Sequence, residues 1–158
     1  MQLHPKWEFV ADTVMGGISN GTVSQEVFEG RKATVLRGNV SLDNNGGFIQ
    51  MAFDLRKNGS GINVSEWDGI ELTVCGNDQN YDIRLRTDQL TRPWQSFRTD
   101  ICIQQVWQTV KVPFATFIAH KVDTAFDPKY LRRIGILAIG REFNALVAVS
   151  SIRFYCDM

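Results

Sequence analysis

The chain has 158 residues, and its 17 basic and 17 acidic side chains give a formal net charge of zero. This length suits one ordinary domain, and a hydrophobic content of 44% provides enough side chains for a full core. The even charge balance argues against a general nucleic-acid binder, which would carry a basic excess. No run of about 18 apolar residues occurs, so the sequence predicts no transmembrane helix.

The first ten residues resemble neither a secretory signal nor an arginine-rich transit peptide, because polar residues such as His4, Lys6 and Glu8 interrupt them. We therefore expect a cytoplasmic protein. Three widely spaced cysteines, Cys75, Cys102 and Cys156, do not form a disulfide framework, and each lies in or beside an apolar run that predicts burial. With two distant histidines and no CxxC motif, we expect no metal and no cofactor.

A glycine-rich turn follows the first strand-like run. Three glycines, an aspartate, a serine and an asparagine stand within ten positions, among them Asp12, Gly16, Gly17 and Ser19. Residues 17–21 match the G-x-S-x-G pattern of a hydrolase nucleophile elbow, but that motif needs a helix after it, and residues 22–27 favour a strand. We therefore expect a structural turn in which Asp12 and Ser19 hydrogen-bond to the backbone.

Strand signals continue along the chain as short β-branched and aromatic runs separated by turn residues. They predict strands over residues 7–10, 22–27, 33–40, 47–55, 69–75, 81–87, 94–103, 109–112, 134–139 and 145–155. Residues 76–78 predict a hairpin between two of them, and residues 114–117 and 128–130 favour short helical turns. Residues 118–129 form the longest irregular segment after the opening turn.

Apolar and polar residues alternate in several of these strands. Tyr81, Ile83 and Leu85, for example, share one face of their strand. A period of two over many short strands indicates an antiparallel sandwich or barrel. No linker, repeat or low-complexity block divides residues 1–158, so we expect a single all-β domain.

Arginines gather on the polar face of the central strands. The candidate binding residues are Arg84, Arg86, Trp94, Arg98 and Gln50, with Asn39 as a further member of the row. Guanidinium groups beside an aromatic ring suit a carboxylate, a phosphate, a sugar or an acidic protein patch. The alternative is the solvated outer face of an antiparallel sheet, although aligned arginines repel one another unless they are paired.

Paired carboxylates for glycoside hydrolysis are a further possibility that the sequence leaves open. The candidates are Asp12, Asp43, Asp54, Glu71 and Asp78. The sequence alone does not pair them, and three of the five stand in turns, where Asp commonly binds its own backbone. We assign no catalytic residue.

An ordered series of short motifs spans the chain from about Trp7 to Tyr155. The motifs are Asp12-x-x-Met15-Gly16-Gly17-x-Ser19, Phe28-x-Gly30, Gly46-Gly47-Phe48, Asp68-Gly69-Ile70, Gly76-x-Asp78-Gln79-x-Tyr81, Leu85-Arg86-Thr87, Trp107 with Val112-Pro113-Phe114-x-x-Phe117, and Ile134-Gly135-Ile136. In order and spacing this series resembles the complex I intermediate-associated protein 30 family.

The resemblance implies a galactose-binding-domain-like jelly-roll β-sandwich of two antiparallel sheets. Mitochondrial members of that family act as assembly factors for NADH:ubiquinone oxidoreductase, and this chain is similar to a minimal, bacterial-type member with one domain. The implied function is a non-enzymatic module that binds a protein partner, a respiratory-complex subunit or assembly intermediate, and reaches the membrane only through it. A carbohydrate or small polar ligand on the arginine-bearing face is the second hypothesis, and a hydrolase using Ser19 or a carboxylate pair is the third.

Overall fold

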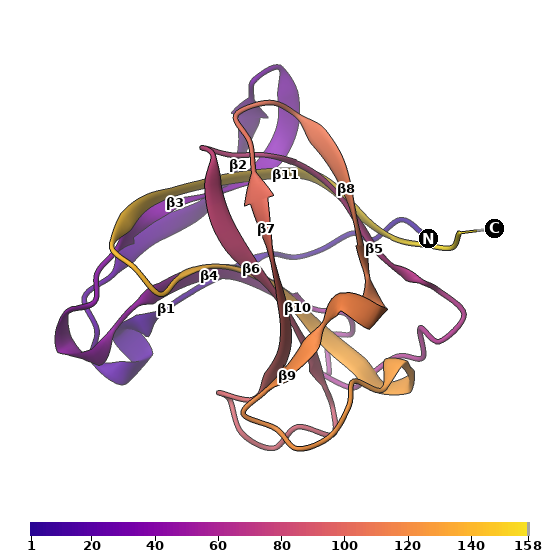
Figure 1. Ribbon diagram of the computed structural model, residues 1–158. Helices are drawn as coiled ribbons and strands as arrows, with labels where there is room; N and C mark the ends of the chain where they lie inside the picture. The colour runs from indigo at the N-terminus through magenta and orange to yellow at the C-terminus, as the bar shows by residue number, and fades with distance from the viewer. Residues whose placement is uncertain (158) are drawn as a thin grey trace.

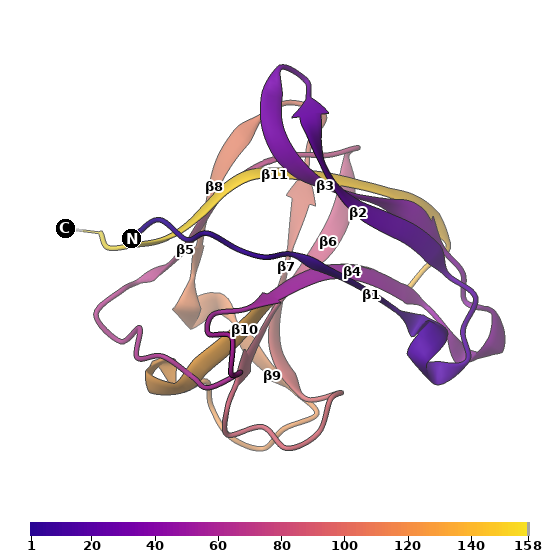
Figure 2. The same cartoon turned by 180° about the vertical axis from the view of Figure 1, so that it is seen from behind.

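The computed structural model describes residues 1–157 as two antiparallel sheets packed face to face (Figure 1). The six-stranded sheet has the order β1-β4-β10-β6-β7-β9, and the five-stranded sheet has the order β2-β3-β11-β5-β8. Viewed from behind, β2, β3 and β11 run together above β1 and β4 (Figure 2). The all-β sandwich of two antiparallel sheets that the sequence predicts is confirmed.

The ten predicted strands begin and end within about three residues of their predicted bounds. The six-stranded sheet contains β1 (Glu8–Ala11), β4 (Phe48–Asp54), β6 (Gln79–Thr87), β7 (Ser96–Ile103), β9 (Ile118–His120) and β10 (Leu131–Ile139). The five-stranded sheet contains β2 (Asn20–Phe28), β3 (Arg31–Val40), β5 (Gly69–Cys75), β8 (Gln108–Pro113) and β11 (Phe143–Tyr155). Short 3₁₀ turns lie between strands at Asp12–Met15, Asp43–Asn45, Phe114–Thr116 and Pro128–Tyr130.

The core lies between the apolar faces of the two sheets. Alternation turns Ile70 and Leu72 of β5 toward Ile83 and Leu85 of β6, and all four side chains are fully buried. Complete burial of such a side chain contributes about 1.5–3 kcal/mol. The same alternation turns the polar residues of β6 outward, onto the solvent side of the six-stranded sheet.

The connection between β5 and β6 differs from its predicted form. Residues 76–78 do not close a hairpin, because β5 belongs to the five-stranded sheet and β6 to the six-stranded sheet. The N–H of Gly76 donates to the carbonyl of Gln104, and the N–H of Asp78 donates to that of Ile103, so the segment packs against the end of β7 as it crosses. A period of two predicts strands, but it does not assign each strand to a sheet.

Two further expectations are corrected. Ile118–His120 forms the edge strand β9 inside the segment that we expected to be irregular, because three residues are too few to show alternation. Cys75 is buried as predicted, whereas Cys102 and Cys156 are exposed. Cys102 faces outward on β7, and Cys156 follows the end of β11. Across residues 1–157, no helix has the length and apolar character needed to cross a membrane.

Candidate functional site

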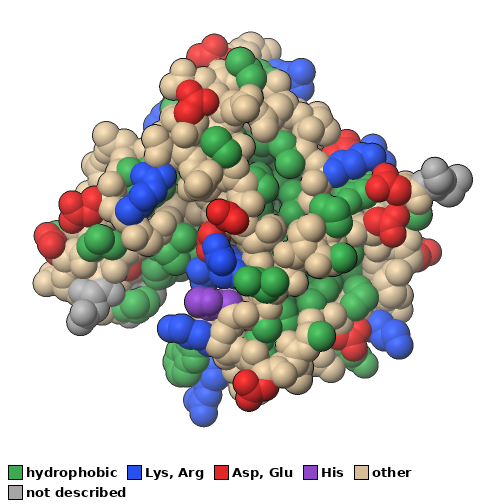
Figure 3. Space-filling model, viewed as in Figure 1, with side chains coloured by type: hydrophobic (Ala, Val, Ile, Leu, Met, Phe, Trp, Pro, Cys, Tyr) green, Lys and Arg blue, Asp and Glu red, His purple; other side chains and the backbone are tan. Residues whose placement is uncertain are grey.

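The strand register gathers arginines on the outward side of the six-stranded sheet, which we call the arginine face. Arg84 of β6 pairs directly with Arg98 of β7, and Arg86 pairs with Arg133 of β10. Directly opposed residues on antiparallel strands share a face, with Cβ atoms about 4.5–5.5 Å apart. Figure 3 shows basic side chains and a histidine along the wall of a hollow on this side of the molecule.

Asp82 joins the first arginine pair. The Nε and Nη2 atoms of Arg84 donate to Oδ2 of Asp82 at 3.1 and 3.0 Å, while Arg98 donates to both oxygens at 2.9 and 2.8 Å. Burial raises the pKa of the Asp82 carboxyl, but the hydrogen bonds and charges of Arg98 and Arg84 outweigh burial and hold the pKa below its usual value. Asp82 therefore removes the repulsion expected between the aligned arginines.

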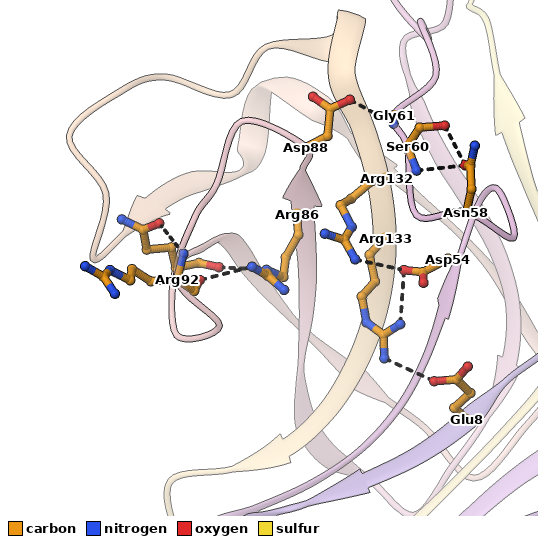
Figure 4. Close-up of polar contacts among 11 residues, drawn as sticks. Glu8, Asp54, Asn58, Ser60, Gly61, Arg86, Asp88, Arg92, Arg132 and Arg133 are labelled. Carbon is orange, nitrogen blue, oxygen red and sulfur yellow. Dashed lines mark hydrogen bonds and ion pairs between the residues drawn. The ribbon is translucent and has the colours of Figure 1, made fainter.

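Asp54 has a similar role beside the second pair. Nη1 of Arg133 donates to Oδ1 of Asp54 at 3.1 Å, and Nη2 of Arg132 lies 3.8 Å from the same oxygen. Glu8 of β1 approaches Arg133 from the other side, at 3.6 Å (Figure 4). Three strands thus contribute to one chain of ion pairs across the face.

Arg86 has a different environment. Its Nε donates to the carbonyl of Gln95 at 3.2 Å and its Nη2 to the carbonyl of Arg92 at 3.0 Å. Within residues 1–157, no carboxylate lies within ion-pair distance of it. Burial lowers the pKa of the Arg86 guanidinium, and the positive charges of Arg132 and Arg133 lower it further. The group stays protonated, so the face holds an oriented positive charge that no acid neutralises.

The other predicted site residues lie in three different places. Trp94 is 56% exposed in the connection between β6 and β7, with the Arg92 guanidinium 5.9 Å from its ring centre. Gln50 of β4 lies on the arginine face, where its Oε1 occupies the space beside Gly135: a Cβ atom added there would lie 2.9 Å from it. Asn39 does not, because β3 belongs to the other sheet, and the prediction that it extends the row was wrong.

Sequence reasoning missed His120, Arg133 and Asp54 as members of this face. His120 stands opposite Ser96 on the unpredicted strand β9. Burial lowers the pKa of its imidazole, and nearby positive charges, Arg84 first among them, lower it further. The alternation in β10 places Arg133 on the opposite face of the strand from Ile134. Only the strand register shows that Arg133 is the neighbour of Arg86.

A second polar cluster lies in the opening turn. The Asp12 cluster consists of Asp12 and the groups that bind it from Ser19, Gly47 and Phe48. Asp12 is fully buried and accepts from the N–H groups of Ser19 at 3.0 Å, Gly47 at 2.6 Å and Phe48 at 3.2 Å. Burial raises the pKa of its carboxyl, but the bonds from the Ser19 hydroxyl and these N–H groups outweigh burial and lower the pKa overall.

Ser19 is engaged on both sides within this cluster. Its hydroxyl donates to Asp12 at 2.5 Å and accepts from the N–H of Ser41 at 2.8 Å. A Cβ atom at Gly17 or Gly46 would lie 2.5 Å from the Asp12 carboxylate, so both positions need glycine. The cluster ties the opening turn to the connection before β4, and the Ser19 hydroxyl binds a carboxylate rather than a histidine or lysine.

The remaining signature residues support strand ends. Oδ2 of Asp68 accepts from the N–H of Asp157 at 2.7 Å, and Oδ1 of Asp78 accepts from the N–H of Gln105 at 3.2 Å. Gly69 lets β5 approach β8 closely, because a Cβ there would lie 2.3 Å from the carbonyl oxygen of Val112. In the described residues, no three His, Cys, Asp or Glu side chains gather closely enough to hold a metal ion.

The family model described as Complex I intermediate-associated protein 30 (CIA30) matches residues 1–146 of the sequence. The chain belongs to the CIA30 family. No curated protein matches the sequence significantly. The family resemblance that the ordered motifs predict is therefore confirmed.

Solved structures with a similar fold include carbohydrate-binding modules of Clostridium thermocellum. A family 11 module of a cellulosomal cellulase superposes with a TM-score of 0.75 at 12% identity, over 96% of this chain and 88% of that one. A family 11 module in complex with a β-1,3-1,4-mixed-linked tetrasaccharide gives 0.77 at 11% identity, over 99% and 95%. A family 30 module gives 0.71 at 15% identity, over 99% and 96%. At such identities, the similarity shows that this CIA30-family chain shares their jelly-roll fold.

The chemistry of the arginine face in this CIA30-family chain follows from its pairing. Asp82 and Asp54 each lie within ion-pair distance of two guanidinium groups, so both carboxylates are already paired. Arg86 contributes a guanidinium that two backbone carbonyls hold and that has no carboxylate partner in the described residues, and Trp94 contributes an exposed ring in the connection between β6 and β7.

Proposed function

We propose that this CIA30-family chain is a non-enzymatic binding module that holds a protein partner on its arginine face during the assembly of NADH:ubiquinone oxidoreductase. The observation that carries the proposal is Arg86, a guanidinium oriented by two backbone carbonyls and left without a carboxylate. Arg and Trp are enriched among residues that dominate binding energy. Trp94 is exposed in the connection between β6 and β7, whose backbone carbonyls hold Arg86. Membership of the family supports a protein as the partner.

The states of the other polar groups support a module without catalysis. The two carboxylates at the centre of the face, Asp82 and Asp54, are both held in ion pairs, and the burial of Asp82 favours keeping its pairs intact. The Ser19 hydroxyl binds Asp12 inside a buried cluster. We place the module in the cytoplasm, where it reaches the membrane through its partner.

Affinity purification of the tagged chain from its host tests this function. We expect the wild-type chain to recover subunits or assembly intermediates of NADH:ubiquinone oxidoreductase. Trp94→Ala should reduce that recovery by about tenfold, the loss typical of an exposed aromatic contact. Arg153→Ala is the matched control, because Arg153 is an exposed side chain on β11 of the opposite sheet. Recovery of none of these subunits, or equal recovery by both variants, would overturn the proposal.

A carbohydrate ligand is the second candidate function. Its support is the exposed Trp94 ring, which is the kind of surface on which sugar rings stack, together with the fold shared with carbohydrate-binding modules. Calorimetric titration with a β-1,3-1,4-mixed-linked tetrasaccharide tests it. Saturable binding that Trp94→Ala removes would favour this candidate, and the absence of heat up to millimolar ligand would reject it for that sugar.

A further inference from the structure

Strands β6, β7 and β10 carry five arginines, and four of them have a carboxylate within 4 Å: Arg84, Arg98, Arg132 and Arg133. Arg86 is the exception among these five, within the described residues. The nearest carboxylate in sequence, Asp88, accepts instead from the N–H of Gly61 at 2.9 Å. Figure 4 shows Asp88 directed toward Gly61 and Arg86 directed toward the Arg92 connection.

Arg86 is oriented before any ligand arrives. Two of its N–H groups donate to the carbonyls of Gln95 and Arg92, which fix the plane of the guanidinium. A guanidinium has five N–H donors, so three remain for a ligand. Fixing the group in advance lowers the entropy lost on binding.

The surroundings of Arg86 favour an anion. Its Cα partner across the sheet is Arg133, and the positive charges of Arg132 and Arg133 act on it. These two arginines share the carboxylate of Asp54, which leaves none for Arg86. Glu8 also lies 3.6 Å from Arg133, and Arg92, whose carbonyl binds Arg86, has no carboxylate within 4 Å in the described residues, so the local charge is positive.

Ser96 gives a second, independent observation. It is 4% exposed, and its Oγ has no hydrogen-bond partner. Because Leu85 pairs with Phe97, the next positions on the two strands, Arg86 and Ser96, both turn to the arginine face. A buried hydroxyl without a partner is costly, and this one lies on the same face as the Arg86 guanidinium.

We propose that Arg86 is the anion-recognition residue of the arginine face and that it takes a carboxylate from an acidic segment of the protein partner. The preference for an anion rests on the site, whereas the choice of a carboxylate from a protein rests on the proposed function. A guanidinium fork matches the two oxygens of a carboxylate.

Nuclear magnetic resonance titration of the ¹⁵N-labelled chain tests the site directly. The Nε–H of Arg86 is held by the Gln95 carbonyl, so its signal reports the guanidinium. The probes are an acetylated tetraglutamate peptide and inorganic phosphate, with sodium chloride at matched ionic strength as the reference. We expect the peptide to shift the Arg86 signal saturably, with a dissociation constant in the millimolar range, and phosphate to bind at least fivefold more weakly.

Two variants distinguish the contribution of the forked guanidinium of Arg86 from that of its positive charge. Arg86→Lys keeps the charge but loses the fork, and we expect it to weaken peptide binding by about fivefold. Arg153→Lys on the opposite sheet should leave binding unchanged. Should Arg86→Lys fail to fold, the wild-type titration decides alone, since a shift that follows only ionic strength overturns the proposal. Tighter binding of phosphate than of the peptide also overturns it.

The failure of this site and the failure of the proposed function are distinguishable. The titration uses no partner, so a peptide that binds at Arg86 supports the anion site even when affinity purification recovers no oxidoreductase subunit. Conversely, recovery of those subunits with no shift at Arg86 removes the anion site and leaves the proposed function standing.

Discussion

The Asp12 cluster and the arginine face both centre on a buried aspartate, yet the two regions complete their hydrogen bonds differently. Neutral groups surround Asp12, and every group that we describe there has a partner. Two guanidiniums surround Asp82, and beside them Arg86 lacks a carboxylate and Ser96 Oγ lacks any partner. A polar cluster that is complete supports the fold, whereas one that is incomplete points to something that binds there.

The largest effect should come from breaking the complete cluster. Asp12→Asn places an amide NH₂ against the N–H groups of Gly47 and Phe48, which then lose an acceptor. Since these bonds are buried and charge-assisted, we expect a loss of about 3 kcal/mol in the free energy of unfolding. Urea denaturation measures it, with Asp123→Asn, an exposed site, as the control. A loss below about 1 kcal/mol would contradict the structural role of Asp12.

Asp82→Asn should have the next largest effect, because it leaves Arg84 facing Arg98 without a negative charge between them. Both arginines are partly exposed, so solvent screens the repulsion, and we expect a loss of about 2 kcal/mol. Asp100 is the matched control. It is the Cα partner of Asp82 and is exposed, so Asp100→Asn should leave stability nearly unchanged, because the lost repulsion of Asp82 is offset by the lost attraction to Arg98.

Acid should remove both aspartate contributions gradually. The fold lowers the pKa of Asp12 and of Asp82, so the folded chain binds fewer protons than the unfolded chain. Their stabilisation is therefore complete above the ordinary carboxyl pKa of about 4 and is lost as pH falls through that value toward the folded pKa. Thermal melts from pH 6 down to about pH 3 check this slope. A double Asp12→Asn, Asp82→Asn variant should show a flatter profile than the wild type.

The smallest effects come from two serines that differ only in their partners. Ser19→Ala removes a hydroxyl that binds both Asp12 and the Ser41 N–H, and we expect a loss of about 1.5 kcal/mol. Ser96→Ala removes a hydroxyl without a partner, so stability should stay within about 0.5 kcal/mol or increase. Differential calorimetry of the two variants compares them, and equal losses would show that the Ser96 hydroxyl is satisfied in solution.

The sequence could predict the sheets and the local role of the opening turn because both depend on near neighbours. Alternation placed Arg84 and Arg86 on one face, and the spacing of Asp12 and Ser19 is short enough for direct bonds. The arginine face depends on register instead. Nothing near Arg86 in sequence indicates that Arg133 lies beside it, or that Asp82 rather than Asp88 pairs with Arg98.

The same limit explains the two topological errors. The turn at residues 76–78 has the composition of a hairpin, but the chain changes sheets there, and Asn39 was misplaced for the related reason that β3 belongs to the other sheet. Turn residues fix the local backbone path, whereas the assignment of a strand to a sheet depends on burial of distant apolar faces.

The strand order has a consequence for synthesis. β10 lies between β4 and β6, and β11 lies between β3 and β5, so the two latest strands in the chain occupy interior positions in their sheets. Until residues 131–155 leave the ribosome, four strand edges have no hydrogen-bonding neighbour and neither sheet is continuous. Unpaired edges of this kind attract other chains. Nascent chains should therefore depend on protection by chaperones until translation is nearly finished.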